Sequence, residues 1–292
     1  MAVTASMVKE LRERTGAGMM ECKKALVETD GDMEAAVEHL RKSGLAKADK
    51  KASRVAAEGK IVLAESAAGT EAVLVEVNCE TDFVAKDENF VAFAVKVAQA
   101  ALESGVTDPA ALMELERDGA SLEQHRQALV AKLGENIQVR RLARLASEGG
   151  LGSYVHHDGR IGVLVALDGG DEELATGLAM HVSFHNPAYL DAGAIPPEVV
   201  EKERQILAAQ AEDSGKPPEI VARMVEGRLR KYLAEITLTG QAFVLDGDVT
   251  VSEVLENKGA SVKGFIRLAV GEGIEKKEGN FADEVMQQVA GR

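Results

Sequence analysis

Residues 1–45 carry apolar side chains at the i, i+3, i+4 spacing of short amphipathic helices. Thr4 is placed to cap a first helix, which Gly16 ends, and Asp32 is placed to cap a third. Between them, residues 19–28 form a second helical segment with Cys22 on its apolar face. Three short helices so close along the chain predict a compact bundle over residues 1–45.

The hydrophobic period changes after residues 46–57, an Ala- and Lys-rich connector that is either helical or extended. Strands are predicted at 61–65, 72–77 and 262–270, a hairpin at 154–167, and helices at 90–102, from 121 onward and at 171–185. Asp158-Gly159 supplies the tight turn of the hairpin, and Ser121 with Gln124 forms a capping-box pattern. These elements predict an α+β fold with antiparallel sheets.

A strand-loop-helix unit occurs twice in this pattern, with loops of different length. The loop at positions 78–89 is twice as long as the loop at positions 168–173. The shorter loop suffices to connect the elements, so the longer one has a purpose besides connection. It carries Thr81, Asp82, Phe83 and Val84 in a chain that is only 3% aromatic. The sequence therefore predicts a surface loop that probes a partner protein.

Residues 197–236 contain two amphipathic helical stretches, each opened by a Pro-Pro pair. Ser214, Gly215 and Lys216 lie at the bend between them. The pattern predicts an antiparallel helical arm whose apolar faces must contact something.

Composition narrows the possible classes of function and the expected location of the protein. The 292 residues have a formal net charge of -14, which disfavours nonspecific nucleic-acid binding. The segment 1–60 differs from the rest, because its basic side chains slightly outnumber its acidic ones. Cys22 and Cys79 stand far apart with no C-x-x-C, so they are predicted to be buried thiols in a reducing compartment. With no signal-peptide pattern and no apolar stretch long enough to span a bilayer, a cytoplasmic location is expected.

Motifs for bond-making chemistry are weak. Lys216 runs into Pro217 rather than the hydroxyl residue of a phosphate-binding loop, so nucleotide hydrolysis is not expected. His181 and His185 have metal-ligand spacing but no clear third ligand, so a metal site is not favoured. No enzyme activity, metal or cofactor is predicted.

Several side chains could either be structural or contact a partner. His156 and His157 flank the hairpin turn, where solvated residues are expected and a partner contact is the alternative. The arginines at 140, 141 and 144, like the basic stretch at residues 42–54, are expected to be solvated. The adjacent Met19 and Met20 point about 100° apart on a helix, so one of them is expected to be exposed at an interface. The alternative is that both pack inside the bundle.

Seven segments together resemble the bacterial elongation factor Ts family, in order and over nearly the whole chain. They are residues 11–26 (LRERTGAGMMECKKAL), 76–86 (EVNCETDFVAK), 134–137 (GENI), 160–165 (RIGVLV), 224–228 (MVEGR), 238–241 (LTGQ) and 264–267 (GFIR). The hairpin departs from the family by carrying two histidines where one is common, so either could be the contact residue.

The resemblance implies a domain plan. It comprises a ubiquitin-associated-like three-helix bundle, a core of two related subdomains with antiparallel sheets and helices, an inserted antiparallel helical arm and a C-terminal helical module. The corresponding ranges are 1–45 for the bundle, 46–57 for the connector, 58–145 for the first subdomain, 146–196 with 237–270 for the second, 197–236 for the arm and 271–292 for the module.

The resemblance also implies a partner, the GTPase elongation factor Tu, and an exchange of GDP for GTP. Thr81, Asp82, Phe83 and Val84 would insert beside the magnesium site of the partner. Docking residues would be Arg12, Met19, Met20, Lys23, Lys51 and His156. The arm would support a two-to-two complex. The alternatives are a passive or chaperone-like partner of a GTPase, and a factor that binds the ribosome or RNA.

Overall fold

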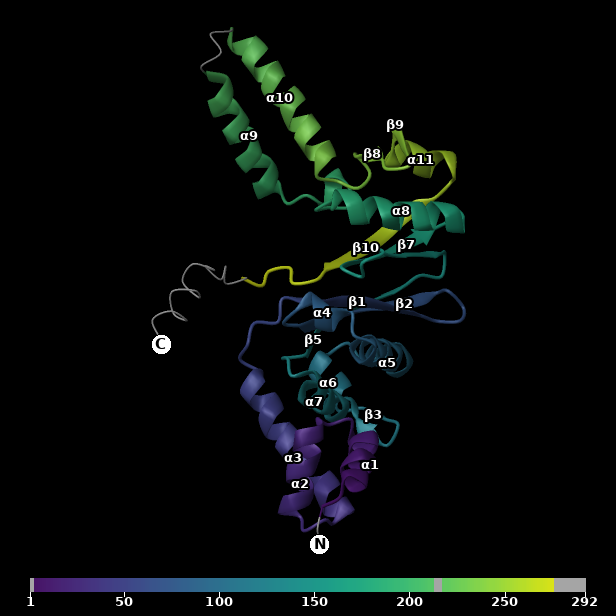
Figure 1. The fold of residues 1–292 in the computed structure, drawn as a ribbon. Coiled ribbons are helices and arrows are strands. Elements are labelled where there is room, and N and C mark those ends of the chain that lie inside the picture. The colour runs from purple at the N-terminus through teal and green to yellow at the C-terminus, as the bar shows by residue number, and fades with distance from the viewer. Residues whose placement is uncertain (1–2, 213–216, 276–292) are drawn as a thin grey trace.

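Three helices form the N-terminal bundle in the computed structural model, which describes residues 3–212 and 217–275 (Figure 1). They are α1 (Ala5–Thr15), α2 (Met19–Glu28) and α3 (Met33–Lys51). Thr4 caps α1 by accepting a hydrogen bond from the Met7 amide, and Gly16 ends the helix in the left-handed conformation. Leu11 and Leu26 are fully buried in the centre of the bundle. The three helices predicted for this segment are present.

Helix α3 extends further than the predicted bundle. It continues to Lys51, so the first half of the connector takes the helical alternative, as its Ala and Lys content favours. The extension lets α3 pack on α7 (Leu122–Leu133). The two helices approach closely at Gly44, where an added methyl would lie 3.5 Å from the Ala131 Cβ.

A first antiparallel sheet has the order β1-β2-β5. Its strands are β1 (Glu58–Glu65), β2 (Glu71–Cys79) and β5 (Gln138–Ala146). The elements on its outer side are α4 (Asp82–Ala85), α5 (Glu88–Ser104), α6 (Pro109–Met113), the short strands β3 (Glu116–Arg117) and β4 (Ala120–Ser121), and α7. Phe90 on α5 is fully buried against this sheet. The predicted capping box at Ser121 and Gln124 is confirmed at the start of α7.

A second antiparallel sheet has the order β10-β7-β6. Its strands are β6 (Leu151–Val155), β7 (Ile161–Asp168) and β10 (Ser261–Ala269). The remaining elements around it are α8 (Glu172–His185), the 3-10 turn η1 (Ala192–Ala194), β8 (Ala242–Phe243), β9 (Asp246–Thr250) and α11 (Val251–Asn257). Helix α8 packs across β6 and β7.

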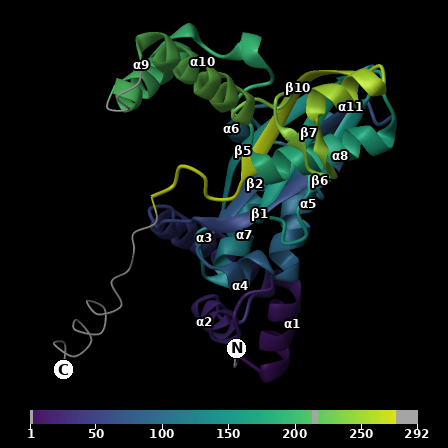
Figure 2. The ribbon, with the colours of Figure 1, turned by 90° about the horizontal axis from the view of Figure 1, so that it is seen from above.

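The two sheets stack face to face, with helices outside both of them (Figures 1 and 2). Ile61 and Leu74 of the first sheet meet Leu164 and Leu268 of the second. The central strands β2 and β7 are covered on both faces, which explains their continuous apolar runs. Gly162 allows the close approach, because a methyl there would lie 2.5 Å from the Ile61 Cγ2. This mixture of helices and antiparallel sheets confirms the α+β class.

Two helices, α9 (Pro197–Glu212) and α10 (Pro218–Glu235), form an arm that projects from the second sheet (Figure 1). Leu207 and Leu229 are buried in the seam between them. At the base, the amides of Ala188 and Tyr189 donate to the Ile236 carbonyl. The predicted bend at 214–216 and nearly all of the predicted module at 271–292 lie outside the described residues. Within the described ranges, no helix has the length and apolarity needed to cross a membrane.

Candidate partner interface

The long loop after β2 presents Phe83 to solvent on a short, capped helix. Thr81 is the N-cap of α4, and its hydroxyl accepts a hydrogen bond from the Val84 amide. Phe83 is the second residue of this helix and is 82% exposed, while Ala85 at the end of the helix is buried. The sequence prediction of a surface aromatic in this loop is confirmed. Phe83 thus stands on an ordered element.

Glu135, just after α7, fixes the backbone of this loop. One carboxylate oxygen accepts hydrogen bonds from the amides of Glu80 and Thr81, at 3.1 and 3.0 Å, and the other accepts from the Thr81 hydroxyl at 2.6 Å. The Glu80 carboxylate in turn accepts from the Asn136 amide. These bonds join segments that lie far apart in the sequence, so local patterns gave no sign of them.

Asp82 and Cys79 complete the loop. The Lys86 ammonium donates to the Asp82 carboxylate at 2.7 Å and lowers its pKa, so Asp82 is charged at neutral pH. Burial raises the pKa of the Cys79 thiol to about 12, and the protonated thiol donates to the Thr81 carbonyl. The described thiols at 22 and 79 are both free and buried. The loop therefore offers one exposed ring beside one negative charge.

Helix α2 offers a second exposed apolar surface. Met19 is 60% and Met20 is 73% exposed, so both methionines face solvent where the sequence predicted only one. The bundle core is already filled by Leu11 and Leu26, which leaves no buried position for either thioether. Lys23 is also exposed on this helix, and Arg12 is exposed on α1.

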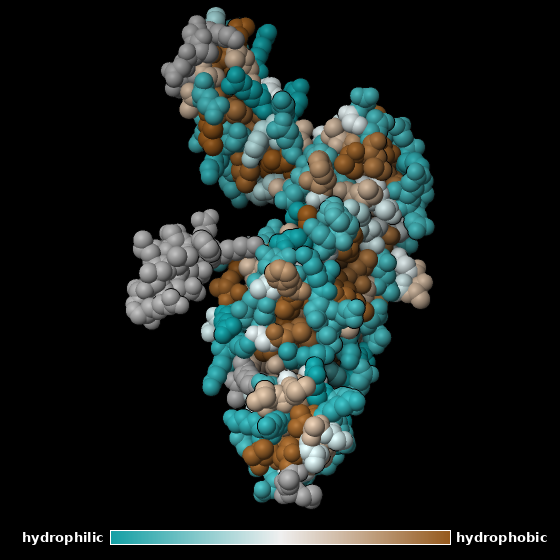
Figure 3. All heavy atoms as spheres, in the orientation of Figure 1, coloured by the Kyte–Doolittle hydropathy of each residue, from teal (hydrophilic) through white to brown (hydrophobic). Residues whose placement is uncertain are grey.

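The two helices that carry these apolar side chains, α2 and α4, both lie below the sheets in the view of Figure 2. Figure 3 shows hydrophobic residues at the surface of the bundle, near α4 and along the arm.

Lys51 and His156 have partners within the chain. The Lys51 ammonium donates to the Gly134 carbonyl at the end of α7, so it ties the bundle helix to the core. The His156 ring lies 3.0 Å from the Tyr154 hydroxyl and packs edge-on against His157. Of the two histidines, His157 is the exposed one. The hairpin that carries them is joined to β1 by the Ile61 amide, which donates to the Gly159 carbonyl.

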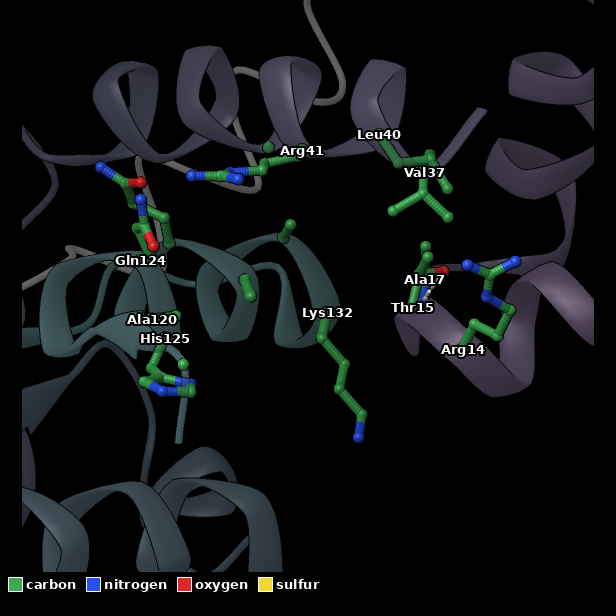
Figure 4. A pocket seen from close by; sticks show the side chains of 15 residues that line it. Arg14, Thr15, Ala17, Val37, Leu40, Arg41, Ala120, Gln124, His125 and Lys132 are labelled. Atoms are coloured by element: carbon green, nitrogen blue, oxygen red, sulfur yellow. Dashed lines mark hydrogen bonds between the residues drawn. The ribbon is translucent and has the colours of Figure 1, made fainter. Parts of the chain in front are cut away.

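A cavity of about 320 Å³ separates part of the bundle from α7. Figure 4 shows Val37 and Leu40 of α3, Thr15 at the end of α1 and Ala17 of the following turn on one side, with α7 across from them. The bundle is therefore held to the core mainly where α3 crosses α7, and its α2 surface remains free of the core.

His181 serves the structure rather than a metal. Its Nδ1 accepts a hydrogen bond from the Val244 amide, and its Nε2 donates to the Gln241 side chain at 2.9 Å. Gln241 donates onward to the Glu235 carbonyl at the base of the arm. Burial lowers the pKa of His181 to about 4, so the ring is neutral. Both ring nitrogens are occupied, which leaves none for a metal.

The solvated interpretation of three arginines was wrong. Arg144 donates to the Glu71 carboxylate and to the carbonyls of Ala101 and Leu102, which end α5. The other two, at positions 140 and 141, bind a carboxylate on β2 that is fully buried. Their partners lie far away in the sequence, so the local run of positive charge was misleading.

The structure thus offers two exposed apolar surfaces, one at Phe83 and one at Met19 with Met20. The family model described as elongation factor TS matches residues 80–272. The chain is 61% identical to elongation factor Ts of Thioalkalivibrio sulfidiphilus over the full length of both. It is 58% identical to that of Methylococcus capsulatus over 99% of both chains. The chain belongs to the elongation factor Ts family.

Proposed function

We propose that this protein is a translation elongation factor that binds elongation factor Tu in its GDP form and promotes exchange of GDP for GTP. It breaks no covalent bond itself. The loop of Thr81, Asp82, Phe83 and Val84 inserts near the magnesium and phosphate site of the GTPase. The observation that carries this proposal is Phe83, an aromatic ring exposed on a loop that Glu135 holds rigid.

Insertion works by linkage. A GTPase holds GDP through backbone amides and a magnesium ion that neutralises the phosphates. A factor that binds better when these contacts are broken must weaken GDP binding by the same factor, at about 1.4 kcal/mol for each tenfold. Burial of the Phe83 ring in the partner contributes roughly 1.5–3 kcal/mol toward this.

The rigid loop increases the effect of that burial. An unstructured loop would lose conformational freedom on insertion, which costs about 1–2 kcal/mol for each ordered residue. The Thr81 cap and the Glu135 hydrogen bonds have already ordered the backbone. The Asp82 charge enters with the ring and perturbs the hydrogen bonds and waters that organise magnesium.

Docking and insertion are separate tasks in this proposal. The bundle, which is ubiquitin-associated-like, binds the GTPase through Arg12, Met19, Met20 and Lys23, and the C-terminal module binds the same domain. The second sheet contacts another domain through the hairpin of His156. The arm supports a two-to-two complex. No nucleotide, nucleic acid or membrane takes part in the contact.

The test is release of fluorescent GDP from purified elongation factor Tu after mixing with this protein and excess GTP. We expect release to accelerate with the concentration of the factor and to reach a plateau. Binding without acceleration would show a passive partner instead. Binding to RNA that weakens steeply with salt, with no effect on release, would show the RNA-associated alternative.

A further inference from the structure

The Glu76 side chain on β2 is a fully buried carboxylate that accepts hydrogen bonds from the first sheet and from the segment that follows β10. It accepts from the Gly271 amide at 2.8 Å and from the Asn78 amide group at 3.0 Å. Arg140 donates to both carboxylate oxygens at 3.2 Å, and Arg141 donates through its Nε. A buried charge requires such a set of donors.

These donors clamp the chain where it leaves the second sheet. Arg141 also donates to the Ala269 carbonyl at 2.9 Å, and Arg140 donates to the Glu272 carbonyl at 2.6 Å. Both arginines belong to β5 of the first sheet, whereas residues 269–272 end and follow β10 of the second. The start of the C-terminal segment is therefore fastened to the first sheet through Glu76.

The segment that connects the bundle to β1 also lies next to this cluster, at Gly271. Gly271 has a φ of +73°, and a methyl on it would lie 2.4 Å from the Ala57 carbonyl oxygen. Ala57 is the residue before β1, on the segment that comes from α3. Position 271 is thus fixed between that segment and the Glu76 carboxylate.

The loop of Phe83 begins a few residues from Glu76 on the same strand. Between them, Asn78 is buried and bridges from the Glu76 carboxylate to the Glu58 carbonyl at the start of β1. Three parts of the chain therefore meet at one hydrogen-bonded cluster. They are the segment from the bundle, the loop of Phe83 and the C-terminal exit, which is residues 269–272 where the chain leaves the second sheet.

We propose that Glu76 is a positioning residue that sets the mutual geometry of these three parts, so that all of them engage the GTPase at once. This inference rests on the proposed function. Contacts held in the right relative positions bind as one unit, because the cost of aligning them is met during folding. Glu76 itself stays buried and contacts no partner.

The charge of Glu76 is essential to this role. Burial by itself would raise the pKa of the carboxyl, but hydrogen bonds from the Gly271 amide, Arg141 and Asn78 outweigh it and hold this pKa below its ordinary value. A Glu76→Gln side chain keeps the size but turns an amide group toward donors. It therefore weakens the clamp on residues 269–272 without leaving a cavity.

Glu71→Gln is the matched control. Glu71 lies on the same strand and pairs with Arg144 of the same neighbouring strand, but its pair binds the end of α5 rather than the C-terminal exit. Glu71→Gln therefore weakens one carboxylate–arginine contact between β2 and β5, and Glu76→Gln weakens two. Only Glu76→Gln loosens the hold on residues 269–272.

The full-length variants are compared by GDP release from elongation factor Tu over a range of factor concentrations. We expect Glu76→Gln to raise the half-saturating concentration at least tenfold, with the plateau rate within about twofold of the unchanged protein. Glu71→Gln should shift the half-saturating concentration less than threefold. An unchanged half-saturating concentration in folded Glu76→Gln, or a lower plateau alone, would overturn the proposal.

Amide hydrogen exchange gives a readout that is independent of the partner. Residues 269–272 should exchange at least tenfold faster in Glu76→Gln than in Glu71→Gln, and equal rates would refute the clamp. If the unchanged protein failed to accelerate GDP release, the proposed function would fail while this measurement still tested the cluster. Should Glu76→Gln not fold, Arg140→Gln, which removes the contact to the Glu272 carbonyl, takes its place with the same expected outcomes.

Discussion

Phe83 has the highest exposure among the large apolar side chains in the described part of the chain. We expect Phe83→Ala to slow stimulated GDP release by about tenfold to a hundredfold, the effect of losing one central hot-spot ring. The thermal unfolding midpoint should change little, since an exposed ring adds almost nothing to the core. Stopped-flow release with fluorescent GDP measures the rate, and circular dichroism checks the fold.

Phe184 supplies the control for this experiment. It lies on α8 and is 77% exposed, so it matches Phe83 in chemistry and exposure but not in position. With Phe184→Ala, GDP release from elongation factor Tu should be as fast as with the unchanged protein. An equal loss in both variants, or none in Phe83→Ala, would contradict the insertion of Phe83 into the partner.

His181 makes stability depend on pH. Its pKa is about 4 in the fold and 6.5 when unfolded, so between these values the unfolded chain binds a proton that the folded chain does not. Stability therefore falls as pH drops through this window, by about 3 kcal/mol at most from this side chain. Urea unfolding at pH 7.5 and pH 5 measures the slope. His181→Gln should show a smaller loss between the two, and an identical loss would contradict the assignment.

At the scale of elements, the short α4 depends on a residue outside its own segment. Glu135→Gln keeps the side chain's shape but sets an amide group against the donors at Glu80 and Thr81. We expect the plateau rate of GDP release to fall about threefold to tenfold, because part of the loop order must be gained on binding. Alkylation of Cys79 should become faster. A normal plateau with faster alkylation would show that loop order is irrelevant to exchange.

Helix α2 is expected to contribute to binding of the GTPase and not to the release of GDP. Replacing Met19 and Met20 together by Ala should weaken complex formation by about tenfold, since each exposed thioether loses contact area in the interface. The plateau rate should persist, and folding should be intact because neither side chain fills the core. Titration of the binding affinity measures this. Val95→Ala, on α5, is the control, and an equal change in both would show that α2 has no docking role.

Local chemistry made some of these elements readable from the sequence. Ser121 and Gln124 lie close together along the chain, so their capping box could be predicted, and the exposure of Phe83 followed from the extra length of its loop. Glu76 and Gly271 are 195 residues apart, and no periodic pattern links them. The arginines of β5 were misread for the same reason. Sequence patterns report which face is apolar, but not which distant charge will be buried opposite.

At the scale of the whole molecule, the arm projects from the second sheet and is bonded to it at its base, where the Ala188 and Tyr189 amides donate to the Ile236 carbonyl. Ile206 on α9 and Ile220 on α10 are exposed, although the seam between the helices is filled. Two helices alone leave such flanks uncovered, and pairing of two arms about a twofold axis would cover them.

We therefore expect an arm deletion to abolish self-association of the free protein or of its complex, with GDP release unaffected. Residues 199–233 would be replaced by a Gly-Ser linker, which keeps the Ile236 carbonyl that holds Ala188 and Tyr189. Analytical ultracentrifugation with and without elongation factor Tu measures the assembly. Monomers and one-to-one complexes in every case would leave the arm without this role.

The strand order of the second sheet has a consequence for synthesis on the ribosome. All three strands of the first sheet have been made once residue 146 is reached. The central strand β7 instead needs β10, and the whole arm is translated between them. At roughly 5–20 residues per second, one edge of β7 stays unpaired for about 5–20 s. The nascent chain thus exposes an open strand edge for that time, and chaperone capture or premature aggregation should begin there.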